Sequence, residues 1–578
     1  MAACPNVTLL ATSRESLHLL SEREYVVLPL REEDAVALFH ERVRASGVVV
    51  AADREATEIC RRLDHLPLAI ELAAARVKVL PPSALLERLE QRLPLLTGGA
   101  RDLPARQRTL RATIDWSYDL LSFSEQRLFA RLAVFGGCTL EAAEKICEAE
   151  LDTLQSLVEK SLLRHTDGRF WMLETIREFA REHLRDLGDE DALARRHASY
   201  FLQLAQETEP GTSGPEQAAL LQILEREHDN ARAAFDWAVE NDVDTALALG
   251  NALQRLWYLH GYAREGLTRL EAALGRDKKA PSLIRARALR SAGTLAEACS
   301  EFTRARELLG ESISLLRGLG YPKELATSLN NQAAIAAHQG DHEAARRAYE
   351  ESLELKRTLD DTLGILVTSS NLAILEGKLG DYEVARRRHE QILPSLRELG
   401  SPYALSNCLA SFGEIALLCG DRIGGRTMLE ESLELRRQVG DKAGMLESQA
   451  LLSRADCADG DRASAELRLR EGLELAQEID DPGMLVAVLE ARADLEAFLG
   501  DAARAIALRT AAERMRSEIG APFFKADVTW RDGAIANARR RLSGGVYERS
   551  CAQGEAASVE EVLAWTQAPV HVPAAAAR

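Results

Sequence analysis

Four asparagine side chains in the second half of this sequence are suited to holding a bound peptide. Asn331 and Asn371 are 40 residues apart, and Asn330 and Asn407 stand at neighbouring positions. The asparagine amide both donates and accepts hydrogen bonds, so a row of such groups can bind a peptide backbone. Local capping, or hydrogen bonding between neighbouring repeats, is the alternative use of the same side chains, and the sequence leaves both uses open.

A second group of residues has the types that hold metal ions. Glu227, His228 and Asp229 are consecutive and are followed by Asn230. Consecutive side chains on a helix fan out instead of converging, so we expect a solvated helix face and no metal site. The chain has nine Cys, an odd number without any C-x-x-C pair, which predicts neither a disulfide framework nor a zinc site.

The remaining polar residues form no catalytic arrangement that the sequence can show. The twelve His are dispersed, and neither an H-E-x-x-H motif nor a nucleophile elbow occurs. Paired acids such as Asp360-Asp361 and Asp480-Asp481 fall in turns, where we expect solvated caps. We therefore predict no catalytic residue, no metal ligand and no enzymatic activity.

The elements that carry these residues repeat every 40 positions. Gly supplies the left-handed residue that ends a helix, and Asp caps the helix that follows. A second turn signal, of Gly or Asp, follows about halfway through each unit, so each unit predicts two helices. The Gly-Asp pairs begin at residues 340, 380, 420, 460 and 500. Small residues recur where the two helices must pack closely, at Ala333, Ala373, Gly413, Ser453 and Ala493 and at Ala345, Ala385, Gly425, Ala465 and Ala505.

This ladder resembles tetratricopeptide repeats over residues 245–521. The usual period is 34 residues, so six extra residues lengthen either the helices or the joints between them. Stacked helix pairs form a solenoid with a curved groove lined by the first helix of each unit, and the resemblance implies a protein or peptide ligand there. Two basic stretches, Arg346-Arg347 and Arg386-Arg387-Arg388, fall on second helices, where we expect a solvated outer face.

The charge and amino-acid composition of the chain narrow the classes of partner further. The formal net charge is -18, which disfavours direct binding to DNA or to anionic membranes, because both require positive potential. The abundance of Ala, Leu, Glu and Arg favours a mainly α protein. No apolar run is long enough to span a bilayer and no signal peptide is evident, so we expect a cytoplasmic protein. Self-association stays open.

The N-terminal third carries a second resemblance. Residues 7–11 and 25–30 predict two short strands, and helices are expected near 32–45, 54–63, 68–79 and 82–91. Leu10-Ala-Thr-Ser-Arg-Glu-Ser-Leu17 and Leu66-Pro-Leu-Ala-Ile-Glu-Leu-Ala-Ala74 resemble the later part of a signal-transduction ATPase of the STAND, or NB-ARC, type. The resemblance implies that Arg14 senses the terminal phosphate of a nucleotide and that Pro67 packs on its adenine.

The sequence departs from that family in the residues that grip nucleotide. No G-x-x-x-x-G-K-[ST] motif occurs, and His65 stands where the family usually has Gly. That motif supplies the phosphate cradle and its Lys, so Arg14 alone cannot hold a nucleotide. We therefore expect no cofactor, with ADP or ATP binding only where a complete nucleotide-binding domain is present upstream. The chain looks like a family member whose first part is missing.

Residues 101–187 resemble the winged-helix domain that follows the ATPase in the same family. Ser122-x-x-Glu125 is a capping box, and Asp167-Gly168 predicts a tight hairpin turn. The helix over 151–161 carries two acids and one base, which disfavours insertion into the DNA major groove. The family's Met-His-Asp motif, whose His contacts ADP, is Met172-Leu173-Glu174 here.

Together these features predict a tetratricopeptide-like α-solenoid preceded by a winged-helix domain, a small helical domain and a residual α/β fragment. We predict a non-catalytic regulatory scaffold that binds a protein or peptide. The alternatives are an ADP- or ATP-dependent transcriptional regulator and a DNA-binding winged-helix regulator. The expected boundaries are residual strands at 1–30, a helical subdomain at 31–100, the winged helix at 101–187, a helical linker at 188–244, the repeats at 245–521, and a C-terminal cap with a disordered tail at 522–578.

Overall fold

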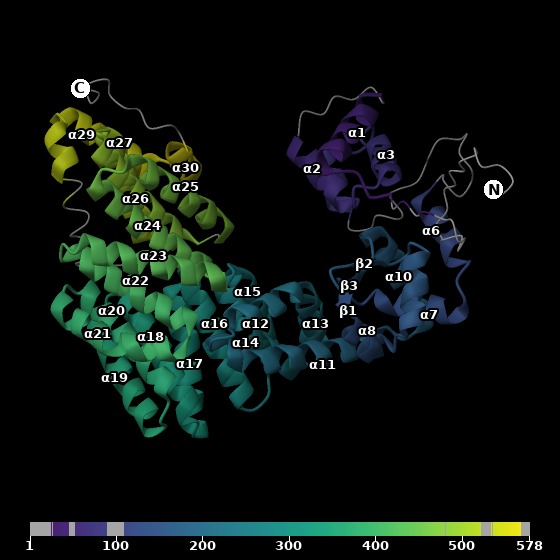
Figure 1. The fold of residues 1–578 in the computed structure, drawn as a ribbon, viewed down its shortest axis with the longest axis horizontal. Coiled ribbons are helices and arrows are strands. Elements are labelled where there is room, and N and C mark those ends of the chain that lie inside the picture. Colours follow the sequence, from purple (N-terminus) through teal and green to yellow (C-terminus); the bar gives the residue numbers. More distant parts are fainter. Residues whose placement is uncertain are drawn as a thin grey trace. The chain divides into compact units, whose positions relative to one another are not determined.

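Helices dominate the computed structural model, which describes residues 23, 25, 27–45, 53–89, 109–479, 481–521, 533 and 536–567 (Figure 1). The chain divides into two compact units, Met1–Phe201 with Asp229–Ala234, and Leu202–His228 with Phe235–Arg578. The predicted mainly α fold with a tetratricopeptide-like solenoid is confirmed. Within the described ranges, no helix is both long and apolar enough to cross a membrane.

Four helices open the first unit at the positions that the sequence predicts, to within a few residues. A small core forms between them from the buried side chains of Phe39, Ile59, Ile70 and Leu85. The helices are α1 (Glu32–Ala45), α2 (Asp53–Arg62), α3 (Pro67–Arg76) and α4 (Pro82–Arg88).

The strand expected over residues 25–30 is not found in the described part of that segment. The backbone N–H of Leu30 instead donates to the carbonyl of His65, at 3.2 Å. A strand needs a neighbouring strand to pair with. Its expected neighbour, residues 7–11, lies outside the described residues, as does Arg14.

The second part of the first unit combines helices with a small antiparallel sheet of order β1-β3-β2. Asp167 and Gly168 both have positive φ, 51° and 76°, so the predicted hairpin turn is confirmed. Both hydrogen bonds of the predicted Ser122–Glu125 capping box are also present. The elements are α6 (Leu110–Tyr118), α7 (Phe123–Leu132), β1 (Cys138–Thr139), α8 (Leu140–Cys147), α9 (Leu151–Glu159), β2 (Arg164–Thr166), β3 (Arg169–Trp171) and α10 (Glu174–Leu187).

The described part of the second unit contains seven helix pairs. We call the first helix of each pair the A helix and the second the B helix. The A and B helices are α14 (Val243–Leu259) and α15 (Ala263–Arg276), α16 (Leu283–Ala298) and α17 (Phe302–Leu319), α18 (Pro322–His338) and α19 (His342–Thr358), α20 (Thr362–Lys378) and α21 (Tyr382–Leu399), α22 (Pro402–Leu418) and α23 (Arg422–Val439), α24 (Lys442–Asp459) and α25 (Arg462–Ile479), and α26 (Pro482–Leu499) and α27 (Ala502–Glu518). Before them come α11 (Glu190–Thr208), the 3-10 helix η2 (Glu209–Ser213), α12 (Gln217–Arg226) and α13 (His228–Asn241).

The Gly-Asp turns work as predicted. Gly340 and Gly420 have φ of 78° and 91°, and the Asp that follows each caps the next helix, with 3.0 Å from Asp341 Oδ1 to the backbone N of Ala344. Asp381 is an exception, since its side chain makes no capping bond. The turns are short and most helices run to 17 or 18 residues, so the extra length of the repeat lies in the helices.

Small residues allow the A and B helices of a pair to approach closely. Ala345, Ala385, Ala465 and Ala505 are all completely buried. Two helix backbones also approach closely in the fifth pair, where a Cβ added to Gly413 would lie 2.9 Å from the carbonyl oxygen of Gly425. That distance is too short for any side chain, so this position requires glycine.

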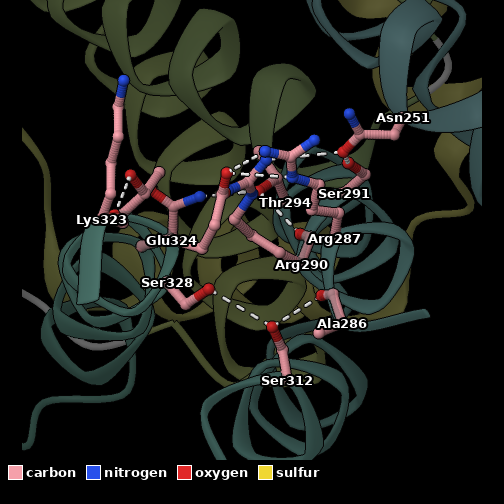
Figure 2. A network of polar contacts seen from close by, with 12 residues as sticks. Asn251, Ala286, Arg287, Arg290, Ser291, Thr294, Ser312, Lys323, Glu324 and Ser328 are labelled. Carbon is pink, nitrogen blue, oxygen red and sulfur yellow. Dashed lines mark hydrogen bonds and ion pairs between the residues drawn. The ribbon is translucent and has the colours of Figure 1, made fainter. Parts of the chain in front are cut away.

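Buried serines join A and B helices at the same phase of the repeat, a feature that the sequence analysis missed. Each Ser Oγ donates to a carbonyl 26 residues earlier, Ser312 to Ala286 at 2.8 Å, Ser352 to Ala326 at 2.7 Å and Ser432 to Ser406 at 2.8 Å. Figure 2 shows the first of these bonds. The hydrogen bond satisfies the hydroxyl inside the core. The spacing of these serines was visible in the sequence.

The C-terminal helices α29 (Gly544–Ala556) and α30 (Val559–Gln567) pack against the last pair. Ala557 and Val562 are buried in one cluster with Leu508 and Met515 of α27, and Trp565 packs on it. They cover an apolar face that would otherwise end the solenoid, which is the capping role that the sequence predicts.

Candidate binding surface on the A helices

One face of the A helices carries half-exposed side chains at a regular spacing. Successive positions lie three or four residues apart and therefore on one helix face. The face combines amides, small or apolar side chains, and charged groups near the helix ends. We call the following residues of α18, α20 and α22 the A-helix strip: Thr327, Asn331, Ala334 and His338; Val367, Asn371, Ile374 and Lys378; Asn407, Ser411, Glu414 and Leu418.

Three of the four predicted asparagines form one hydrogen-bonded chain between repeats. Asn371 Nδ2 donates to Asn330 Oδ1 at 3.1 Å, and Asn330 Nδ2 donates to Asn331 Oδ1 at 3.2 Å. Asn331 Nδ2 in turn donates to Thr294 Oγ1 on α16, at 2.9 Å. The geometry thus shows the inter-repeat use of these amides. An amide has two donor hydrogens and an acceptor oxygen, so one such bond leaves capacity for a ligand.

The fourth asparagine, Asn407, is not part of that chain. Its Oδ1 accepts a hydrogen bond of 2.9 Å from Arg436, whose side chain is buried. Arg436 also donates to Ser448 Oγ at 2.8 Å. Asn407 is therefore oriented by a buried cation of the following B helix, and the structure does not bring it together with Asn330, Asn331 and Asn371.

The amide chain continues into a larger polar network at the start of the solenoid (Figure 2). Asn251 Oδ1 accepts hydrogen bonds from Ser291 Oγ at 2.9 Å and from Arg290 at 3.4 Å. Glu324 of α18 accepts from Arg287 at 2.9 Å and is also ion-paired with Arg290. Burial raises the pKa of Glu324, but the charges of Arg290 and Arg287 outweigh burial and leave it below its usual value.

Sequence reasoning missed the first two members of this polar series. Asn251, Ser291, Asn331, Asn371 and Ser411 are spaced by 40 residues and all lie on A helices. The predicted amide row begins only at Asn330, although the 40-residue period of the Gly-Asp turns places Asn251 and Ser291 in the same row. The polar surface therefore begins in the first helix pair.

Charged groups from different repeats also converge beside the strip. Glu297 Oε1 of α16 lies 3.6 Å from His338 Nε2 of α18, and the ring of Phe302 stacks on His338 with 5.2 Å between ring centres. Burial raises the pKa of Glu297 to about 7 against the opposing charge of Lys378. Burial, together with the charges of Lys378 and Arg516, lowers the pKa of His338 to about 3.

These two side chains are accessible as well as desolvated. His338 keeps 36% of its side-chain surface exposed and Glu297 keeps 17%. Loss of surrounding water shifts a pKa in this way when protein encloses a group on most sides. Partial exposure together with the loss of surrounding water is typical of a recessed surface that a ligand can still reach.

Toward the C-terminal end, the A helices carry paired charges. Arg454 Nε lies 2.9 Å from Asp494 Oδ2, and Arg509 approaches the other oxygen of Asp494 at 2.8 Å. Arg516 pairs with buried Glu490, also at 2.8 Å. Charges of both signs alternate here, unlike the continuous positive surface that nucleic acids require.

The solenoid curves enough for its first pair to meet its fifth. The rings of Tyr258 on α14 and Tyr403 on α22 lie 6.4 Å apart, and the guanidinium of Arg255 lies 4.9 Å from the Tyr403 ring centre. His260 Nε2 lies 3.2 Å from the carbonyl oxygen of Val439. The A helices between these contacts therefore surround a common interior.

The expected solvated face of Glu227, His228 and Asp229 is wrong for the first two residues, and Asp229 is exposed as expected. Glu227, His228 and Asn230 are buried, and His228 Nε2 accepts a hydrogen bond of 2.9 Å from Trp257. Asn230 accepts from the backbone N of Gly136 at 2.9 Å and donates to the carbonyl of Gly137 at 2.8 Å. Contacts with residues far away in the sequence therefore surround these groups. Among the described residues, no three His, Cys, Asp or Glu side chains are placed to hold a metal ion.

The remaining predicted residues have different surroundings. Arg386 and Arg387 are exposed and pair with Glu383, as expected for an outer face. Arg388 instead pairs at 2.7 Å with buried Glu376, so the prediction of a solvated face is wrong there. Asp481 caps α26 from a buried position instead of a solvated one. Pro67 is the first residue of α3, and Arg14, the other residue that the resemblance assigns to nucleotide, lies outside the described residues.

Comparison with known proteins agrees with this class of fold. Residues 324–398 match the family model described as tetratricopeptide repeat. These residues cover the helix pairs α18–α19 and α20–α21, so tetratricopeptide repeats form part of this solenoid.

Proteins similar in sequence to this chain are found in mycobacteria. Proteins of Mycobacterium tuberculosis (strain ATCC 25618 / H37Rv) and Mycobacterium bovis, named as candidate HTH-type transcriptional regulators, are 37% identical over 355 residues, covering 57% of this chain and 40% of theirs. The chain thus spans well under two thirds of the length of these relatives.

Two solved structures were also similar. One is a signal transduction ATPase with a tetratricopeptide repeat sensor from Pyrococcus horikoshii, with 16% identity, a TM-score of 0.43 and coverage of 91% of this chain and 75% of that one. The other is a Rap protein complexed with competence and sporulation factor, with 15% identity, a TM-score of 0.39 and coverage of 63% and 99%.

Proposed function

We propose that this chain is a non-catalytic regulatory scaffold whose solenoid binds a protein or peptide segment along the A-helix strip. The observation that carries the proposal is the chain of amides through Asn330, Asn331 and Asn371, which crosses successive A helices on a half-exposed face. Amides oriented by one another present fixed donors and acceptors to an extended backbone.

The other members of the strip suit the side chains of such a segment. Ala334, Val367 and Ile374 offer small apolar contacts beside the amides. His338 and Lys378 stand at the helix ends, near the recessed acid Glu297. This mixture of apolar contacts and charges of both signs favours a peptide of mixed composition over a polyanion.

The names of the mycobacterial relatives favour a role in transcriptional regulation. In that role the solenoid would receive the signal, and the N-terminal unit or further chain would deliver the response. Direct contact of DNA by residues 101–187 is not proposed. The short helix α9 carries the acids Asp152 and Glu159, and their negative charge would repel DNA phosphates. Nucleotide binding through Arg14 and Pro67 is proposed only for a chain with a complete phosphate cradle.

The test begins with peptides selected by display on the full chain. We expect the selected peptides to bind Asn331→Ala and Asn371→Ala about tenfold more weakly, since each substitution removes an oriented hydrogen-bonding group. Arg387→Ala on the outer face is the matched control and should bind as the unchanged chain does. Thermal melting checks that each variant remains folded. Equal affinity for all folded variants would place binding elsewhere and reject the A-helix strip.

A further inference from the structure

A short segment of the chain itself lies against the A helices. Residues 209–217, which read Glu-Pro-Gly-Thr-Ser-Gly-Pro-Glu-Gln, connect α11 to α12 and include the 3-10 helix η2. The side chains of Thr212 and Gln217 are buried, the latter completely. A Gly- and Pro-rich connection of this kind normally runs over the surface. This one instead buries two of its side chains in the second unit.

Three groups from two distant helix pairs hold the segment. Asn251 Nδ2 of the first pair donates to Glu209 Oε1 at 3.1 Å, and Arg255 of the same helix donates to Ser213 Oγ at 3.2 Å. The backbone N–H of Tyr403, in the fifth pair, donates to Gln217 Oε1 at 3.2 Å. Asn251 is also the first member of the 40-residue polar series. The segment therefore uses the same kind of group that the proposed ligand would use.

We propose that residues 209–217 are a built-in occupant of the first end of the 40-residue polar series, at Asn251, and that a partner segment of similar chemistry displaces them when it binds there. The matching partner is a peptide that presents a carboxylate, a hydroxyl and a carboxamide at the spacing of Glu209, Ser213 and Gln217. This inference rests on the proposed function, because it assumes that the A helices bind peptides.

Displacement would act on the link between the two units. Helix α11 starts in the first unit and ends in the second, with the division after Phe201. Residues 209–217 follow it directly. Once the segment is released, α11 loses the anchor at its C-terminal end. Binding in the solenoid would thereby change how firmly the second unit holds the C-terminal end of α11.

An attached segment competes strongly with a free one. Intramolecular occupation by a short tether corresponds to an effective concentration on the order of millimolar. The apparent affinity for an added peptide falls by the fraction of molecules whose surface is open. Weakening the attached segment should therefore tighten the binding of a free copy.

The experiment uses a fluorescent synthetic peptide with the sequence of residues 205–220 and measures its anisotropy on the full chain. The triple variant Glu209→Ala, Ser213→Ala and Gln217→Ala should bind it at least about tenfold more tightly than the unchanged chain, because three hydrogen bonds of the competitor are lost. Glu216→Ala changes an exposed residue of the same segment and should bind like the unchanged chain. A peptide with the same three alanines should not bind.

Two further measurements keep the outcome clear if burial of Gln217 makes the triple variant unstable. The double variant Glu209→Ala and Ser213→Ala keeps Gln217 and should show a smaller gain in affinity. In the unchanged chain, saturating peptide should speed amide hydrogen exchange in residues 209–217.

Equal peptide affinity for all chains, with unchanged exchange, would overturn the displacement. The same holds if no chain binds this peptide. Neither result would touch the proposed function, which the display-selected peptides and the Asn331 and Asn371 variants test separately.

Discussion

Glu297 and His338 lie 3.6 Å apart, from Oε1 to Nε2, on consecutive A helices of the solenoid. Burial raises the pKa of Glu297 to about 7 and lowers the pKa of His338 to about 3. At neutral pH the imidazole is therefore uncharged and the carboxyl is partly protonated. The two residues form a neutral polar contact instead of an ion pair.

The first prediction concerns the pH dependence of stability. The pKa of Glu297 in the folded chain, about 7, is above its ordinary value of 4.5, so its contribution is present at low pH and is lost as pH rises through that window. The lowered pKa of His338 acts in the opposite direction, but only below pH 6.5. As pH rises from 6.5 to 8, the Glu297→Gln variant should therefore lose less thermal stability than the unchanged chain.

Over this pH range the effect should be about 1 kcal/mol at most. Thermal melts at several pH values measure it directly. Parallel melting profiles for Glu297→Gln and the unchanged chain would show that the carboxyl is already ionised at neutral pH in the folded state.

The second prediction concerns Gly413, where the backbones of α22 and α23 approach closely. Gly413→Ala places a methyl group 2.9 Å from the carbonyl oxygen of Gly425, so the pair α22–α23 must move apart. We expect a loss of about 1–3 kcal/mol in the free energy of unfolding. Gly310→Ala is the control, because nothing lies within 4 Å of its added Cβ in α17, and it should stabilise by up to about 1 kcal/mol.

Urea unfolding of both glycine variants gives the comparison. A similar small effect at both positions would mean that α22 and α23 adjust to a methyl group without cost.

The third prediction concerns a buried lysine. Lys356 Nζ donates to Thr368 Oγ1 at 2.6 Å, and burial lowers the pKa of Lys356 to about 8 despite the nearby charge of Asp361. Forty residues later the same positions hold Leu396 and Cys408, which share an apolar cluster. Lys356→Leu should be neutral or stabilising by about 1–2 kcal/mol at pH 7, since burying the charge is costly.

Chemical unfolding at pH 7 tests the lysine, with exposed Arg357→Leu as a control expected to change stability by less than about 0.5 kcal/mol. Because the pKa of Lys356 is lowered in the folded chain, the unchanged chain should gain stability relative to Lys356→Leu as pH rises above 8. A loss of more than about 2 kcal/mol at pH 7 would show that the bond to Thr368 outweighs the burial cost.

The sequence predicts the features that depend on local chemistry. The Gly340-Asp341 turn requires a left-handed glycine and a capping acid, and both appear in the structure. The Ser122–Glu125 capping box and the Asp167-Gly168 turn are equally local and equally well predicted. Such signals involve residues close in sequence, so no knowledge of packing is needed.

The features that were missed depend on residues far apart in the chain. Asn230 looks like a surface residue of a helix, yet it is buried because Gly136 and Gly137 need a partner for their backbone. The holding of Glu209 by Asn251 likewise follows from the curvature of the solenoid, which no short stretch encodes. The partner-binding role of the four asparagines stays a prediction.

The contact of His260 with Val439 depends on the number of repeats between the first and the fifth helix pair. A Cβ added to Gly440 would lie 2.7 Å from His260 Nε2, so only glycine fits there. Deleting one 40-residue unit between them would bring Asp480 into the place of Gly440. Inserting one unit would bring Gly400 there instead. At this contact, an added repeat would therefore keep glycine, whereas a removed repeat would place a side chain against His260.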